Sequence, residues 1–196
     1  TIITIEHSGE YNLSRHQIQW GIKYQSERIR DRVSEWEMRD SAGYSLPYDD
    51  QTIRLYRSIK ADNHLNSNRY SAFIQDNFTT QFGDSKLSFN YGSRMQYWDL
   101  NRQTIFSPRV SIRYYPNRYK PFQIHAAWGI YQQMPFFKEL KNREAKLTTN
   151  LHAQKSTHYL LGVDYPFWWG DRPFKFSTDL WYKSLTHLIP YKITNL

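Results

Sequence analysis

The sequence predicts an all-β protein, an antiparallel up-and-down meander that forms the wall of a transmembrane β-barrel. Three observations predict this fold class. Apolar and polar residues alternate along most of the chain, and short and long connections take turns between the alternating segments. Tyrosine, phenylalanine and tryptophan make up 17% of the 196 residues, a content that suits sheet surfaces better than helix bundles.

The expected strands follow from alternation with a period of two residues. Residues 1–11 and 69–78 alternate less regularly than the rest but still predict strands. In residues 16–24, Ile18 and Trp20 fall on one face and glutamines fall on the other. The same contrast between a bulky apolar face and a polar face recurs in residues 86–98, 108–115, 122–130, 158–165 and 174–183.

The connections between these segments alternate in length. Short ones are expected at residues 12–15, 79–85, 116–120 and 166–172, and long ones at about residues 29–68, 99–106, 132–155 and from 184 onward. Outer-membrane barrels have short periplasmic turns and longer extracellular loops, whereas soluble sandwiches mix connection types and use Greek-key crossovers. The alternation therefore favours a barrel.

Aromatic residues gather near both ends of the expected strands. Rings at the headgroup level flank the lipid-facing band of membrane barrels. We therefore expect a membrane belt at the rim where the short turns lie. Its members are Tyr114, Tyr115, Tyr119, Phe122, Phe167, Trp168 and Trp169.

The charge balance is basic, with 26 lysines and arginines against 18 acidic residues and a formal net charge of +8. These charges are spread along the chain without a lysine- and arginine-rich run, so no nucleic-acid partner is expected. Attraction to outer-membrane lipid and lipopolysaccharide is the use that we expect. The absence of cysteine excludes disulfides and thiolate metal sites.

Glycines recur inside the alternating segments, in WGIKY, YGSRM, WGIYQ and LGVDY. Gly21, Gly92 and Gly129 fall on the polar face of their segments. Glycine weakens a strand, so this row needs a cause, either bending of the sheet or close approach of another group. Both causes stay open at this point.

No motif predicts an enzyme or a cofactor. The chain lacks the GxSxG, P-loop and Rossmann fingerprints. Its seven histidines show no HxH or HExxH spacing, and we expect His152 and His158 to be structural or surface residues. Asp49-Asp50 lacks the dense run of oxygen ligands found in a calcium loop. We expect no catalytic residue and no metal site.

Three stretches carry a resemblance to a known family. FSPRVSIRYYPN, AAWGIYQQMPFFKELKN and NLHAQKSTHYLLGVDY resemble the barrel of TonB-dependent outer-membrane receptors, especially those of Bacteroidetes type. RYSAFIQDNFTT followed by LSFNYGSRMQYW is similar to consecutive strands of the same family. The matching positions are Ser107-Pro108-Arg109, Gly129, Tyr131-Gln132, Pro135, Asn150-Leu151, Ser156, Tyr159 and Gly162. Ala153-Gln154 and Gln133-Met134 depart from the family's usual Pro-Glu and Pro-Pro.

The resemblance implies a large transmembrane barrel of about 22 strands, of which this chain offers about eight to ten. Residues 1–196 are then expected to be one partial β-barrel domain without the plug domain and the closing strands. The chain has no initiator methionine, which we interpret as a sign of a longer protein. The intact protein would sit in the bacterial outer membrane and take up a siderophore, glycan or peptide with its plug domain and TonB.

Residues near the long connections that face the barrel interior are the candidates for contact with a small solute. Aromatic rings can stack on a ligand ring, and arginines can hold an anionic group. The candidates are Arg94, Gln96, Trp98 and Arg102 on one hairpin and Tyr131, Gln132, Phe136 and Phe137 on another.

Two alternatives remain. One is a small complete outer-membrane barrel of eight strands with a structural or adhesive role, and the other is a soluble β-sandwich that binds glycan or nucleic acid. In a membrane barrel the apolar residues form an exposed, outward band, whereas in a sandwich they pack under a second layer. The residues that test this are Ile18, Leu87, Phe89, Ile112, Ile124 and Leu161.

Overall fold

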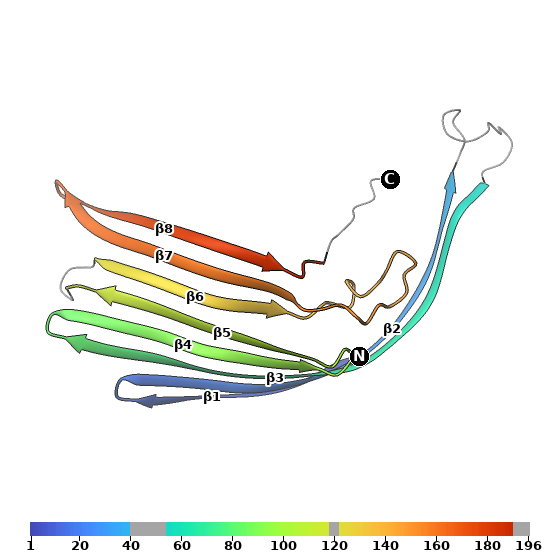
Figure 1. The fold of residues 1–196 in the computed structure, drawn as a ribbon, viewed down its shortest axis with the longest axis horizontal. Coiled ribbons are helices and arrows are strands. Elements are labelled where there is room, and N and C mark those ends of the chain that lie inside the picture. The colour runs from blue at the N-terminus through green and yellow to red at the C-terminus, as the bar shows by residue number, and fades with distance from the viewer. Residues whose placement is uncertain (40–53, 118–121, 190–196) are drawn as a thin grey trace.

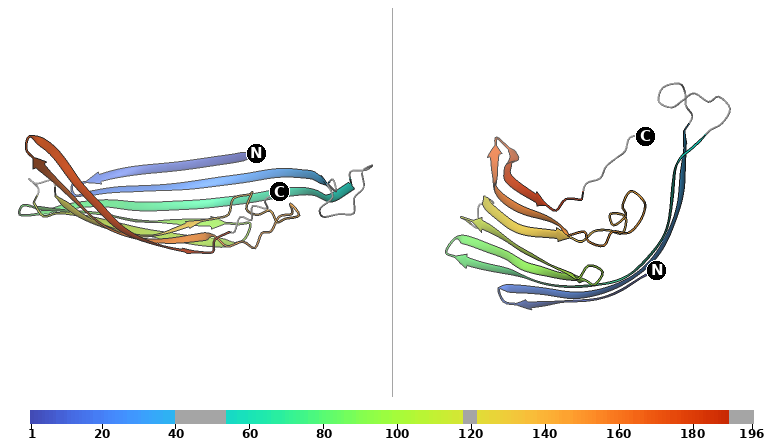
Figure 2. Two further views of the ribbon diagram at one scale, coloured as in Figure 1. Left: turned by 90° about the horizontal axis from the view of Figure 1, so that it is seen from above. Right: turned by 45° about the vertical axis from the view of Figure 1, so that its right-hand side comes forward.

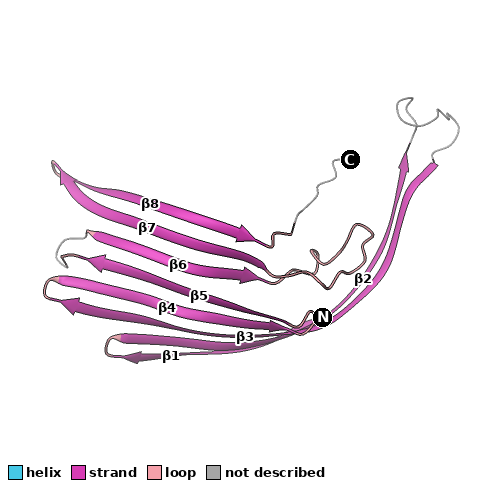
Figure 3. Ribbon diagram, viewed as in Figure 1, coloured by secondary structure: helices cyan, strands magenta, loops and turns pink. Residues whose placement is uncertain are grey.

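The computed structural model describes residues 1–39, 54–117 and 122–189. These residues form one antiparallel sheet of eight strands in chain order, so the predicted all-β meander is confirmed (Figure 1, Figure 3). The strands are β1 (Ile2–Leu13), β2 (His16–Arg39), β3 (Arg54–Phe82), β4 (Ser85–Trp98), β5 (Gln103–Tyr115), β6 (Gln123–Gln133), β7 (Gln154–Trp169) and β8 (Arg172–Thr186). None of the described residues forms a helix long and apolar enough to cross a membrane.

The sheet is open and curved. Figure 2 shows a concave face, over which the β6–β7 connection lies, and a convex face on the other side. Strands β1 and β8 lie at the two edges, and within the described ranges they pair with β2 and β7 but not with each other. The alternative of a small closed eight-stranded barrel is therefore not what these strands form.

The convex face carries the apolar residues and is open. Ile22, Ile74 and Leu161 are exposed over 60%, 57% and 53% of their surface. No second layer covers this face in the part of the chain that the structure describes, which contradicts the sandwich alternative. None of the six test residues is buried, namely Ile18, Leu87, Phe89, Ile112, Ile124 and Leu161.

Three of the short connections are two-residue turns between strands that pair to their ends. They lie between β1 and β2, β3 and β4, and β7 and β8. Gly83 and Gly170 adopt positive φ angles of 56° and 62°, a conformation that a side chain disfavours and that tight hairpin turns require. The turns are shorter than the ranges predicted because the strands continue closer to them.

Two of the predicted long connections are wrong. Most of residues 29–68 is a paired ribbon, because β2 continues to Arg39 and β3 begins at Arg54. The outward face of this ribbon is not continuously apolar, because arginines precede Trp36 on it, so the alternation that marked the other strands is interrupted. Residues 99–106 reduce to a four-residue turn between β4 and β5, and Asp99 anchors it by accepting a hydrogen bond from the backbone N–H of Asn68 at 2.7 Å.

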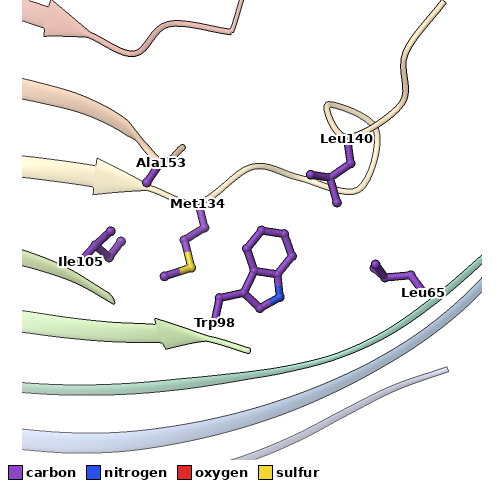
Figure 4. Packing of buried hydrophobic residues seen from close by; sticks show 6 residues of the cluster. All are labelled: Leu65, Trp98, Ile105, Met134, Leu140 and Ala153. Carbon is purple, nitrogen blue, oxygen red and sulfur yellow. The ribbon is translucent and has the colours of Figure 1, made fainter. Parts of the chain in front are cut away.

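The connection between β6 and β7 is long, as predicted, and it folds over the concave face of the sheet (Figure 1). We call the end of the sheet opposite to the two-residue turns its upper end. There the side chains of the connection pack against β3, β4 and β5 and form the main apolar core of the described residues (Figure 4). The core consists of Leu65, Trp98, Ile105, Met134, Leu140 and Ala153.

The inward glycines have a local cause, which is close approach of neighbouring groups. A Cβ atom on Gly21 would lie 2.4 Å from the ring of Phe73, which covers it from the adjacent strand. A Cβ atom on Gly92 would lie 2.5 Å from the carbonyl oxygen of Ile74. Both distances are shorter than a Cβ atom tolerates. The Phe73 ring can therefore lie over Gly21, and the β3 backbone can lie against Gly92, because these residues are glycine.

Candidate functional site

The concave face contains a polar hollow of about 410 Å³. Strands β2, β3 and β4 form its floor, and the first residues of the β6–β7 connection form one wall. The side chains that line it include four glutamine amides, three cations, one acid and two phenylalanine rings. They are Glu6, Lys23, Gln25, Arg69, Phe73, Arg94, Gln96, Gln132, Gln133 and Phe136.

Four of the predicted contact residues line this hollow together. Arg94 and Gln96 point into it from β4, and Gln132 and Phe136 reach it from the end of β6 and the loop that follows. Arg94 lies 5.7 Å from the ring of Phe73, measured to the ring centroid, so its guanidinium group is held above the floor of the hollow. The structure thus brings together residues from two hairpins, about 40 positions apart in the sequence.

The other predicted residues lie elsewhere. Arg102 is exposed at the β4–β5 turn with a positive φ of 53°. Tyr131 packs its ring 4.7 Å from that of His158 on β7, away from the lining of the hollow. Phe137 packs against the apolar core, with the ammonium group of Lys141 5.2 Å from its ring. Contact of these residues with a solute stays a prediction.

Trp98 is on the expected face but is completely buried, with 0% of its surface exposed. The β6–β7 connection covers it (Figure 4). The guanidinium group of Arg69 lies 4.2 Å from the centroid of its ring. A cation over an aromatic face is stabilising, especially away from water. Contact between Trp98 and a solute would require this connection to move away.

Sequence reasoning missed two cations of the hollow, Lys23 and Arg69. Lys23 occupies the polar face of β2 and lies 3.9 Å from a carboxylate oxygen of Glu6. Arg69 is fixed by the loop, since it donates a 3.2 Å hydrogen bond to the carbonyl oxygen of Pro135. The alternation of residues 16–24 could have indicated Lys23, because it shares a face with Gln17 and Gln19. Nothing in the irregular segment 69–78 indicated Arg69.

The predicted belt residues divide between the two faces. Adjacent residues of a strand point to opposite sides, so Tyr114 and Tyr115 are separated, as are Trp168 and Trp169. The convex set is Tyr114, Phe122, Phe167 and Trp169, the concave set is Tyr115 and Trp168, and Tyr119 lies outside the described residues.

The convex rings near the β7–β8 turn contact one another. The ring of Phe174 lies 5.8 Å from that of Phe167 and 6.2 Å from that of Trp169. The ring of Phe122 meets that of Tyr165 edge to face at 5.9 Å. Insertion of this ring cluster into the headgroup region stays a prediction.

The histidines considered above lie apart. The ring of His152 is 5.8 Å from that of His187, and His158 is 2.6 Å from the hydroxyl oxygen of Ser156. Within the described ranges, no three histidine or acidic side chains come together as ligands for a metal ion. Asp49-Asp50 lies outside these ranges.

The chain matches a known protein family. The model of the family described as TonB dependent receptor-like, beta-barrel matches residues 3–194. The chain belongs to this family. It is therefore a segment of a TonB-dependent receptor barrel of the bacterial outer membrane, a family of transport barrels rather than enzymes.

A solved structure shows the same fold. The chain is similar to the copper transporter OprC with a TM-score of 0.53 and 14% sequence identity, over 93% of this chain and 29% of that chain. At this identity the likeness shows the fold alone, and the chain spans less than a third of the length of OprC. No curated protein sequence matches the chain. The predicted TonB-dependent receptor barrel is confirmed at this level.

Proposed function

We propose that the chain is part of the wall of a receptor that captures a scarce solute outside the cell and admits it by TonB-driven active transport. The family supports this function, and so does the arrangement of an apolar convex face and a polar concave face. In this proposal residues 1–196 form one partial β-barrel domain. The intact protein supplies a plug domain and contacts TonB, outer-membrane lipid and lipopolysaccharide, and has no nucleic-acid partner.

The observation that carries the proposal is the polar hollow beneath the β6–β7 connection. Its volume of about 410 Å³ falls within the range of small-molecule sites. Arg94 and Lys23 offer positive charge, Gln96 and Gln132 offer both donors and acceptors, and Phe136 offers a ring. This set fits a solute with anionic or hydroxyl groups and a flat surface, which a siderophore, a glycan or a peptide can each provide.

We also propose the finer relationship to receptors of Bacteroidetes type. Tyr131-Gln132, Pro135 and Asn150-Leu151 support it, since they match that pattern in order on both sides of the β6–β7 connection. This relationship bears on the choice of solute, so glycans and peptides belong in any test beside siderophores.

The test uses the intact receptor expressed in cells that lack it, with and without TonB. Accumulation of a labelled ferric siderophore, an oligosaccharide and an oligopeptide is measured. We expect one class to accumulate only when both receptor and TonB are present. Equal accumulation of all three classes in cells without TonB would overturn the proposal.

The role of the hollow is tested with Arg94→Gln, against Arg113→Gln as a matched control on the same face outside the hollow. Loss of a hydrogen bond to a charged group costs about 1.5–3 kcal/mol, which corresponds to at least about a tenfold rise in the solute concentration for half-maximal uptake. The control should leave this concentration unchanged. Equal effects of both substitutions would place the solute elsewhere.

A further inference from the structure

The ribbon formed by the upper parts of β2 and β3 has a basic outward face that the solute site does not use. On β2, Arg28, Arg30 and Arg32 alternate along this face. On β3, His64 lies opposite Arg30, and Lys60 lies on the same face opposite Ser34. All five residues are exposed. We call these five residues the outer basic face.

The opposite side of the same ribbon is covered. Asn63 and Leu65 are buried there, and Asn63 donates a 2.7 Å hydrogen bond to the carbonyl oxygen of Ala145 in the β6–β7 connection. The exposed basic residues are therefore separated from the polar hollow by the thickness of the sheet. Whatever binds them lies outside the barrel wall.

The outer basic face continues the convex face that carries the apolar residues. Below it on that face lies a row of three rings, Tyr24, Tyr70 and Tyr97, whose centroids are 5.2 Å and 6.2 Å apart. Below this row follow the exposed Ile22 and Ile74. Tyrosine rings between an apolar band and a polar surface are typical of the membrane interface.

The distance from this row to the basic residues places them above the lipid acyl chains. Arg28 follows Tyr24 by four residues, which is about 13 Å along a strand and about 10 Å in height for a strand tilted by about 40°. The headgroup layer of a bilayer is about 5–7 Å thick on each side. Arginine side chains are long enough to reach down into such a layer.

The chemistry of this face suits phosphate. Guanidinium groups form paired hydrogen bonds to phosphate oxygens, and arginine is favoured where such planar recognition occurs. Asp62 holds two of these groups side by side, with a carboxylate oxygen 3.6 Å from Arg30 and 3.2 Å from Arg32. It is the single acid on this face between Arg28 and Arg32, so the surface keeps an excess of positive charge.

We propose that the outer basic face binds the phosphate groups of lipopolysaccharide in the outer leaflet, beside the barrel wall. The site rests on the outer-membrane position of the chain and does not depend on which solute the receptor takes up. An acidic soluble protein is a less suitable occupant, because the face runs directly into the ring row and the apolar band below it.

The test compares the intact wild-type receptor with the triple variant Arg28→Gln, Arg30→Gln, Arg32→Gln. Binding of fluorescent lipopolysaccharide to each purified protein is measured in detergent without solute. The matched control is Lys138→Gln, Arg143→Gln, Lys146→Gln, which removes the same charge from exposed positions of the β6–β7 connection. Far-ultraviolet circular dichroism and heat-modifiable gel mobility check that all three proteins are folded.

We expect the arginine triple variant to bind at least about tenfold more weakly, since each basic residue near an anionic lipid surface contributes measurably. The control should bind as the wild type does. Lipopolysaccharide with its phosphates removed should bind weakly and equally to all three proteins. Equal binding of intact lipopolysaccharide to the wild type and the arginine variant would overturn the proposal, and so would an equal loss in the control.

Uptake measurements keep this proposal separate from the function of the hollow. The arginine triple variant should transport solute with the wild-type concentration dependence, while Arg94→Gln should bind lipopolysaccharide normally. If the arginine variant bound lipopolysaccharide normally and instead lost an acidic protein partner, the face would be a protein-binding surface and the phosphate assignment would be wrong.

Discussion

The lower and upper parts of the β2–β3 pair have the same backbone pairing but opposite polarity. In the lower part, Ile22 and Ile74 point outward and are exposed, while Gln19 and Gln75 meet on the inside through a hydrogen bond. In the upper part the apolar residue points inward, where Leu65 is 2% exposed, and arginines point outward. The surroundings of each face therefore decide its composition, and the strand pairing does not.

The inversion occurs over a short distance. Tyr24 and Tyr70 are the outward rings below the arginines, and Ile29 and Leu65 are the first inward aliphatic residues above them. Below this boundary the outward face is placed against lipid, so it is apolar. Above it the outward face is the one that we propose meets headgroups, and the inward face meets the β6–β7 connection. Breaking each kind of apolar contact separately tests this difference.

The largest effect is expected from Trp98→Ala in the inward core. Trp98 is fully buried, and replacing a buried tryptophan with alanine costs about 3–5 kcal/mol. We expect the β6–β7 connection to lose its protection from hydrogen exchange in the intact receptor, while the lower strands keep theirs. Leu180→Ala, on the outward face where Leu180 is 75% exposed, is the control and should change neither. Unchanged protection of the connection in Trp98→Ala would show that this core does not hold it.

A somewhat smaller effect is expected from Leu161→Arg on the outward face. A charge facing lipid near the bilayer midplane costs about 2–4 kcal/mol, whereas a charge facing the lumen is tolerated. The adjacent Leu160→Arg is the control, because it places the same residue on the inward face of β7. Denaturant unfolding of the intact receptor in lipid vesicles measures both. Equal destabilisation by the two substitutions would show that the outward face of β7 does not contact lipid.

Alternation in the sequence predicts the lower part of the sheet but not the upper part. Alternation predicts the lower strands because one face of each is continuously apolar, and it places Arg94 and Gln96 on the inner side. Gln132 and Phe136 follow instead from their place beside the long β6–β7 connection. Alternation predicts a loop at residues 29–68, because the apolar residues of this ribbon are sparse and change from one face to the other. A search for a change of phase, rather than for a continuous apolar face, could have found it.

The burial of Trp98 was beyond such a search. It depends on a connection that begins more than 30 residues later and folds back over the sheet, and alternation carries no information on which loop covers which face. The faces of consecutive aromatic residues are the second feature that the prediction got wrong. The sequence predicts one cluster from Phe167, Trp168 and Trp169, whereas the strand directs the middle residue to the other face.

The smallest effect is expected at a polar contact between the β2–β3 ribbon and the β6–β7 connection. Lys141 donates a hydrogen bond of 2.8 Å to a carboxylate oxygen of Asp31, and Asn63 lies 3.3 Å from the same oxygen. The hydrogen bond from Lys141 lowers the pKa of Asp31 below its usual value of 3.8. Since the folded form has the lower pKa, the ionised carboxylate stabilises the docked connection at neutral pH.

This stabilisation is lost as the pH falls from about 4 through the lowered pKa of Asp31, because the protonated acid no longer pairs with Lys141. We expect trypsin cleavage after Arg143, assayed at neutral pH, to be faster in Asp31→Asn than in the wild type. Protection of the connection from hydrogen exchange should decrease as the pH falls below about 4 in the wild type but change little in the variant. Glu144→Gln is the control, since Glu144 pairs with Lys146 inside the connection and does not reach the ribbon. A pH response that persisted in Asp31→Asn would show that this ion pair does not hold the connection. The inward apolar residues of the upper part would then dock it alone.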